Sequence, residues 1–315
     1  MRILLLLLSL TLACAPAATL GAQPQSYDVL FSARFVPHEG HAEATIEVTR
    51  NNGALMQLDL NAPAPRFSGF TGDGEVSRQG RRLVWQVPAN GGKLHYRVLV
   101  DRKRGTGYDA LMTDDWVVMR LDNLFPAARV RSTAGAFSRS TLSFDGPSGW
   151  SFESPYGPAA EPLAVAARGH RFTRPVGWLA AGDLGIRRTV IAGRDIAIAG
   201  PRGENFRRMD LLAFLHWTVP ELVRIAPSLP SRVLIVGGSE AMWRGGLSGP
   251  ASLYVHPARP LLSGNSTSTF LHELMHVAMQ GRGAPGDDWI VEGIPEYYSL
   301  VILLRTGGIN GERFE

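Results

Sequence analysis

The sequence has a single cysteine among its 315 residues, Cys14. One thiol cannot form an intramolecular disulfide, so a disulfide-stapled fold is excluded and the hydrophobic core must hold the chain together. Lysine is nearly as scarce, because only Lys93 and Lys103 among the 32 basic residues are lysines. The arginines are scattered along the chain. The sequence shows neither the basic stripe nor the interleaved aromatic residues of a nucleic-acid-binding protein, and we therefore predict no nucleic-acid partner.

Long apolar runs are missing except at the start, where residues 3–12 follow the charged head Met1-Arg2 and precede several small residues. Such a run is too short to span a bilayer and is typical of a secretory signal. We expect residues 1–22 to be a signal peptide cleaved after Ala22, with cleavage after Ala15 or Ala17 as alternatives. Because the residues around Cys14 loosely resemble a lipoprotein cleavage box, a lipid anchor at Cys14 is an alternative fate. We expect an exported protein, periplasmic or extracellular, with no transmembrane span in the mature chain.

The first half of the mature chain reads as all β. Short alternating or apolar runs cover residues 27–35, 42–49, 55–60, 82–87 and 94–101, with turn-forming clusters between them. Residues 109–122 and 138–144 continue the pattern, and 146–169 read as a long loop. The apolar content of 45% suits a globular protein, and the length suits two domains. We predict a sandwich-like N-terminal domain over residues 25–175, with the boundary near Pro175.

The second half mixes strands and helices. We expect two short strands over residues 187–198 turning at Ala192-Gly193, and a helix over 206–225 that Pro220 should kink or split. A buried strand over 232–236, an edge strand over 252–256 and a helix over 269–278 follow. Strands followed by helices predict an α+β domain over residues 176–315.

The last of these helices carries the motif His-Glu-x-x-His, formed by His272, Glu273 and His276. Residues four apart lie one helical turn from each other, so both imidazoles can reach a single ion. Zinc binds imidazole readily, and a catalytic zinc site takes three protein ligands. Glu273 lies beside the first ligand, where it could accept a proton from an activated water.

A third ligand is available in Glu292, a few residues before Pro295. Proline is tolerated in the first turn of a helix, which would place Glu292 near a helix start, together with Asp287 and Asp288. Glu296 lies one turn further on. It could accept the second N–H of a ligand histidine and so fix its tautomer.

These motifs resemble the gluzincin metallopeptidases, most closely the bacterial glycyl aminopeptidase family and more distantly aminopeptidase N. The likeness rests on His272-Glu273-x-x-His276, on Trp289-x-x-Glu292-Gly293 and on Tyr297-Tyr298. It implies a thermolysin-like zinc peptidase domain in which Zn²⁺ is held by His272, His276 and Glu292, with Glu273 as general base. A peptide or protein would be the substrate.

A second segment carries the resemblance to the substrate site. Residues 244–249 and the apolar run after them resemble the Gly-Gly-Leu-Glu-His segment and the substrate-binding edge strand of that family. The implied substrate-binding residues are Gly245, Gly246, Leu247, Ser248, Ser252 and Tyr254. His256, at the end of the strand, could line the same cleft.

The sequence also departs from the family. Ser248 stands where the family has the glutamate that binds a substrate's amino terminus, so we predict an activity that depends little on a free amino end. The spacer between His276 and Glu292 is short. The chain ends at Glu315, before the region that supplies the family's oxyanion tyrosine, which implies a C-terminally short domain. The alternative to a peptidase is a catalytically weak or inactive, metal-containing, peptide-binding envelope protein.

Overall fold

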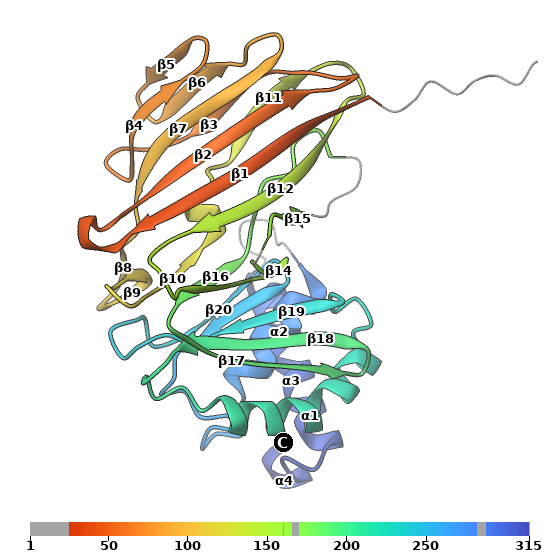
Figure 1. Cartoon of the computed structure of the whole chain (residues 1–315). Helices are drawn as coiled ribbons and strands as arrows, with labels where there is room; N and C mark the ends of the chain where they lie inside the picture. The colour runs from red at the N-terminus through yellow and green to blue at the C-terminus, as the bar shows by residue number, and fades with distance from the viewer. Residues whose placement is uncertain (1–24, 160, 166–169, 282–287, 315) are drawn as a thin grey trace, which may run out of the picture.

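The computed structural model describes residues 25–159, 161–165, 170–281 and 288–314 (Figure 1). The predicted signal peptide, Cys14 and Asp287 lie outside these residues. Within them the chain forms four sheets and few helices, and no helix is long and apolar enough to cross a membrane.

The N-terminal half is all β, as its alternating pattern predicted. One six-stranded sheet has the order β15-β12-β1-β2-β7-β4, and a four-stranded sheet has the order β11-β3-β6-β5. Along β1, alternate side chains such as Tyr27, Val29 and Phe31 enter a core that also contains Leu58 and Trp85 from the four-stranded sheet. The strands of the first sheet are β15 (Leu163–Val165), β12 (Phe137–Asp145), β1 (Ser26–Val36), β2 (His41–Arg50), β7 (Gly91–Leu99) and β4 (Phe67–Gly72); those of the second are β11 (Ala128–Ser132), β3 (Leu55–Asn61), β6 (Arg82–Gln86) and β5 (Val76–Gln79).

A second six-stranded sheet, the middle sheet, lies between this half and the rest of the molecule (Figure 1). Its central strands are buried on both faces: Leu179 and Ala181 of β16 join the N-terminal core, whereas Trp178 and Ala180 face the opposite way. The predicted boundary near Pro175 falls just before β16, which pairs with β13 and β10 from earlier in the chain. In order, the strands are β14 (Gly157–Pro158), β13 (Ser151–Ser154), β16 (Trp178–Gly182), β10 (Trp116–Arg120), β9 (Gly107–Met112) and β8 (Arg102–Arg104).

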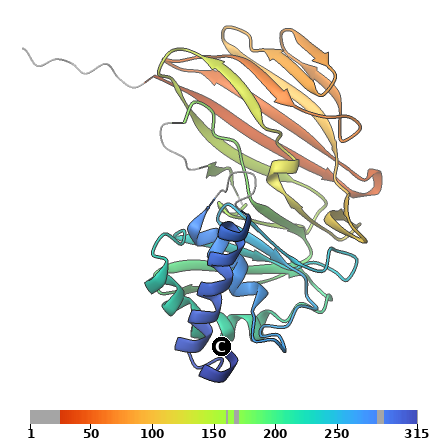
Figure 2. The ribbon, with the colours of Figure 1, turned by 180° about the vertical axis from the view of Figure 1, so that it is seen from behind.

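The C-terminal half consists of a five-stranded mixed sheet with helices on one face (Figures 1 and 2). Apolar side chains of the sheet, including Ile198 and Ile235, pack against Leu215 of α1 and Leu274 of α2. The opposite face of the sheet packs on the middle sheet. The strand order is β17 (Leu184–Ile191), β18 (Arg194–Pro201), β19 (Arg232–Val236), β21 (Ser252–Val255) and β20 (Gly246–Gly249); the helices are α1 (Arg208–Ile225), α2 (Thr269–Met279), α3 (Asp288–Arg305) and the short α4 (Gly311–Phe314).

The predicted hairpin around residue 192 is confirmed. β17 and β18 pair in antiparallel register up to Ile191 and Arg194, which leaves a two-residue turn. Ala192 and Gly193 both have positive φ, 46° and 73°. Two positive φ values suit the right-handed twist of the strands that the turn joins.

Several expectations were wrong. The strand at residues 252–255 is not an edge strand, because the glycine-rich segment before it forms β20 and covers its outer side. Of the two alternatives for Pro220, a split is excluded, because α1 is continuous from Arg208 to Ile225; the other alternative was a kink. Pro295 lies inside α3 rather than in its first turn. A proline removes one backbone hydrogen bond, and here the helix continues on both sides of it. The segment 146–169 also contains β13, β14 and β15, all too short to stand out in the sequence.

Candidate metal centre

Helix α2 positions the two histidines. Ser268, one of the cap candidates that precede the helix, accepts a hydrogen bond from the Leu271 N–H at 3.4 Å and so satisfies a free donor of the first turn. Leu271, Leu274 and Met275 are buried among the sheet and the other helices. That packing fixes the rotation of α2 and leaves its histidines on the partly open side.

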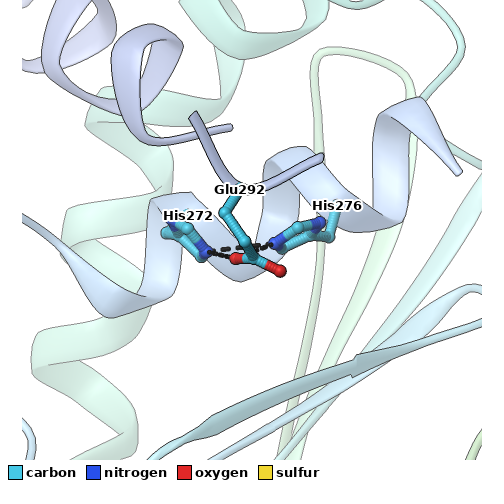
Figure 3. A group of neighbouring side chains, drawn as sticks. All are labelled: His272, His276 and Glu292. Atoms are coloured by element: carbon cyan, nitrogen blue, oxygen red, sulfur yellow. Dashed lines mark hydrogen bonds and ion pairs between the residues drawn. The ribbon is translucent and has the colours of Figure 1, made fainter. Parts of the chain in front are cut away.

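Helix α3 brings two glutamates to the same place, and Figure 3 shows one of them, Glu292, beside the two histidines. Glu292 Oε2 lies 3.1 Å from His272 Nε2 and 3.2 Å from His276 Nε2, and the two histidine nitrogens lie 3.0 Å apart. One turn further along α3, Glu296 Oε2 lies 2.9 Å from His272 Nδ1. The structure therefore brings together the predicted ligand set and its predicted supporting carboxylate.

The three facing atoms suit a zinc ion. Zinc binds nitrogen and carboxylate oxygen at about 2.0–2.1 Å, so tetrahedral ligands lie about 3.3 Å from one another. The observed separations of 3.0–3.2 Å are close to that value. The chemistry of the set, two imidazoles and a carboxylate, is also that of a zinc site, and among the described residues these three form a group that could hold a metal.

The general-base candidate, Glu273, lies deeper than the ligands, with 8% of its surface exposed. Ser248 of β20 donates to its carboxylate twice, from the backbone N–H and from the hydroxyl. A methyl group on Gly246 would lie 2.7 Å from Glu273 Cγ, so only glycine allows β20 to approach α2 this closely. Gly246 and Ser248 of β20 thus lie directly against Glu273.

Burial shifts two pKa values in the site. It raises the pKa of Glu273, although the neighbouring His272 and the hydrogen bonds from Ser248 oppose the shift. Burial lowers the pKa of His276, with His272 acting in the same direction. A lowered pKa keeps the imidazole of His276 neutral, which is the form that binds a metal.

The predicted substrate residues fall into two groups. Gly246, Leu247 and Ser248 are half-buried. The His256 N–H donates to Gly245 O, so Gly245 is a hydrogen-bonded position in the antiparallel pairing of β20 with β21. Such positions alternate along a strand, so the backbone N–H and C=O groups of Gly246 and Ser248 point away from β21. Gly245 also lies in this segment, against the Trp243 ring.

Ser252 and Tyr254 do not fit a substrate-binding role. Both are fully buried in β21: Ser252 Oγ accepts from the Trp178 N–H at 2.8 Å, and the Tyr254 hydroxyl donates to Trp243 O at 3.1 Å. His256 is also fully buried, and its Nδ1 accepts from the Ala258 N–H, so it does not line the cleft. The prediction placed these three residues on the edge strand of the sheet, but β20 forms that edge and leaves β21 inside the sheet.

Sequence reasoning missed Arg120, the last residue of β10. Its Nη1 donates to Ser248 O at 3.4 Å, and its side chain borders a hollow of about 420 Å³ together with Ser248 and His276. The two contact residues lie 128 positions apart in the chain. No local pattern in the sequence could have linked them.

Comparisons with known proteins extend this picture at the level of the fold. No protein-family model matches the sequence, and a search of curated proteins finds no match. An aminopeptidase N family protein from Idiomarina loihiensis is similar in structure over 91% of this chain and 56% of its own, with a TM-score of 0.67 and 14% identity. Yeast leukotriene A4 hydrolase in complex with bestatin is similar over 91% and 49%, with a TM-score of 0.54 and 18% identity. The chain thus spans about half the length of these solved structures and shares their fold.

Proposed function

We propose that the protein is an exported zinc peptidase of the gluzincin type, with a thermolysin-like catalytic domain that binds Zn²⁺ through His272, His276 and Glu292. The single observation that carries the proposal is the convergence of these three side chains at 3.0–3.2 Å, next to the buried Glu273. The fold shared with an aminopeptidase N family protein supports it. When bound, zinc would supply a Lewis acid that polarises a peptide carbonyl and acidifies a water molecule.

The chain's own residues would hold and move the proton. Glu273 would accept the proton of the attacking water and return it to the departing amine. Its raised pKa suits the first half of this transfer, because a more basic carboxylate takes a proton more readily near neutral pH. Glu296 would keep the proton of His272 on Nδ1, which leaves Nε2 free to bind the ion.

The substrate backbone would lie along β20. The backbone N–H and C=O groups of Gly246 that point away from β21 lie at the outer edge of the sheet. Adding a peptide strand to such an edge is a common mode of peptide recognition. The outward groups of Ser248 already contact Glu273 and Arg120.

The alternative, a peptide-binding envelope protein with a structural metal, does not explain why Glu273 is buried and held by Ser248. Two measurements on the full-length protein separate the alternatives: the zinc content, and the hydrolysis of a mixed peptide library. We expect one zinc per chain and hydrolysis by the wild type. Glu273→Gln should retain zinc and lose about 10²–10⁴-fold in turnover, and His276→Ala should lose both. Zinc bound without hydrolysis in the wild type would favour the binding protein.

A further inference from the structure

The hollow beside the candidate metal centre has a positively charged lining. It measures about 420 Å³ and lies between Arg120 of β10, the segment from Ser248 to Pro250, and the end of α2 with His276 and Gln280. Among the described residues that line it, Arg120 is the only one that is always charged, and none is a carboxylate. A substrate bound at the metal centre would extend into this hollow or past its mouth.

The guanidinium of Arg120 is only partly neutralised. Its Nε lies 3.6 Å from Asp122 Oδ2, but Asp122 also pairs with Arg174 at 3.3 Å and accepts the Gly177 N–H at 3.1 Å. Two arginines therefore share one carboxylate, and the cluster keeps a net positive charge. About 29% of the Arg120 side chain is exposed.

Arg120 also keeps hydrogen-bond donors for a ligand. A guanidinium has five N–H groups in a fixed fork. Within the described part of the chain its one hydrogen bond runs from Nη1 to Ser248 O, at 3.4 Å. The carbon between its nitrogens lies 5.9 Å from the Trp178 ring centre, which supports the planar group from one side. A fork held in this way matches the two oxygens of a carboxylate.

The surroundings extend the positive field. Arg120 also borders a second hollow, of about 280 Å³, which Arg102, Arg104 and Leu247 of β20 line as well. This second hollow contains three arginines and two aspartates. An ammonium group placed in the first hollow, beside Arg120, would face a cation and, among the described residues that line this hollow, no carboxylate that could offset its lost hydration.

We propose that Arg120 makes the hollow beside Ser248 a subsite for a carboxylate of the peptide substrate, carried either by its C-terminus or by an Asp or Glu side chain. The inference rests on the proposed peptidase function and adds the substrate class. The protein would then prefer substrates with an acidic group near the scissile bond and would not require a free amino terminus.

Equilibrium binding tests the subsite without depending on turnover. The full-length Glu273→Gln protein, supplied with zinc, is titrated calorimetrically with two pairs of matched probes. One pair is acetyl-Ala-Ala-Ala with a free or an amidated C-terminus, and the other is acetyl-Ala-Glu-Ala-amide against acetyl-Ala-Gln-Ala-amide. We expect the charged member of at least one pair to bind about 10- to 100-fold more tightly. The pair that shows the effect identifies the source of the carboxylate.

Second-site variants assign the preference to Arg120. In the same background Arg120→Gln should abolish it, Arg120→Lys should reduce it because lysine lacks the two-pronged fork, and Arg131→Gln, an exposed arginine on β11, should leave it intact. Equal binding within both pairs, or a preference that survives in folded Arg120→Gln, would overturn the proposal. If Arg120→Gln does not fold, an unchanged preference in Arg120→Lys overturns it instead.

The two proposals can fail separately. If the wild type shows no hydrolytic activity but a carboxylate preference that depends on Arg120, the peptidase proposal is contradicted and the subsite proposal is supported. Hydrolysis by the wild type with no such preference would do the reverse.

Discussion

His272 and Glu296 form a hydrogen-bonded pair across two helices, with His272 Nδ1 lying 2.9 Å from Glu296 Oε2. The contact sets the tautomer of His272, because a proton on Nδ1 leaves the Nε2 lone pair pointing at Glu292 and His276. It also orients the ring, which α2 alone would leave free to rotate.

Removing this partner should weaken the metal site without destroying it. We expect Glu296→Ala to lower zinc affinity about 10- to 100-fold, as loss of an outer contact to a ligand histidine commonly does. Competition with a chromogenic chelator measures the change. Glu312→Ala, at an exposed position on α4, controls for the loss of a carboxylate. Unchanged zinc affinity in Glu296→Ala would reduce Glu296 to a surface residue of α3.

Gly246 sets the distance between β20 and α2. A Cβ there would lie 2.7 Å from both Glu273 Cγ and Thr269 Cγ2, which is shorter than any relaxed contact. We expect Gly246→Ala to cost about 1–3 kcal/mol of unfolding free energy through overpacking. Because the nearest atom belongs to the proposed base, kcat/KM should also fall, by as much as about 100-fold.

Gly264→Ala is the matched control for this substitution, since a Cβ at Gly264 meets no atom within 4 Å. Urea unfolding and peptide hydrolysis on both variants give the comparison. Equal behaviour of the two alanine variants would show that the strand can move away from α2 at no cost.

Glu153 ties the middle sheet to the C-terminal sheet. It is completely buried on β13 and accepts hydrogen bonds from Arg188 of β17 and Arg232 of β19. Removing Glu153 would leave Arg188 without this carboxylate and Arg232 with Asp195 as its remaining partner. We therefore expect Glu153→Ala to destabilise the protein by about 3–5 kcal/mol. Asp28→Ala, which breaks the exposed pair with Arg139, should cost at most about 1 kcal/mol in the same unfolding experiment. Similar losses from both changes would contradict this view of Glu153.

Glu221 gives a pH-dependent link between α1 and α3. Hydrogen bonds from Arg224, at 2.6 Å, and from Arg305, at 3.0 Å, lower the pKa of Glu221 from 4.5 to about 2. A lowered folded-state pKa contributes stability above pH 4.5, and this contribution is lost as the pH falls toward 2.

We expect Glu221→Gln to cost about 1 kcal/mol at pH 7, the upper range for a solvated ion pair, and less than half of that at pH 3. Urea unfolding at the two pH values tests this, with Glu312→Gln as the control. A cost that does not change with pH would show that the glutamate acts through packing rather than charge.

The sequence pointed to the residues of the candidate metal site almost completely. His272 and His276 have the i, i+4 spacing of one helix face, Glu292 follows as a third possible ligand, and the alternating pattern of residues 27–60 placed three strands correctly. The edge of the C-terminal sheet was placed wrongly, because the glycines of β20 lower its strand propensity and hid it. Arg120 was missed for a different reason. Its contact with Ser248 depends on how the middle sheet packs on the C-terminal sheet, and that relation leaves no periodic signal in either segment.

The pairing of β16 between β13 and β10 has a consequence for the order of folding during synthesis. Residues 25–175 are synthesised before β16 is complete. At that stage the middle sheet therefore lacks the strand that joins β13 to β10. Even after Gly182 has emerged, Trp116 and Trp178 face outward until β18 and β19 cover them. Proteins usually fold from the N-terminal end as they are made. In this chain the early half keeps an exposed apolar face until the strands of the C-terminal sheet have been translated, and this is the interval in which a chaperone would be most useful to it.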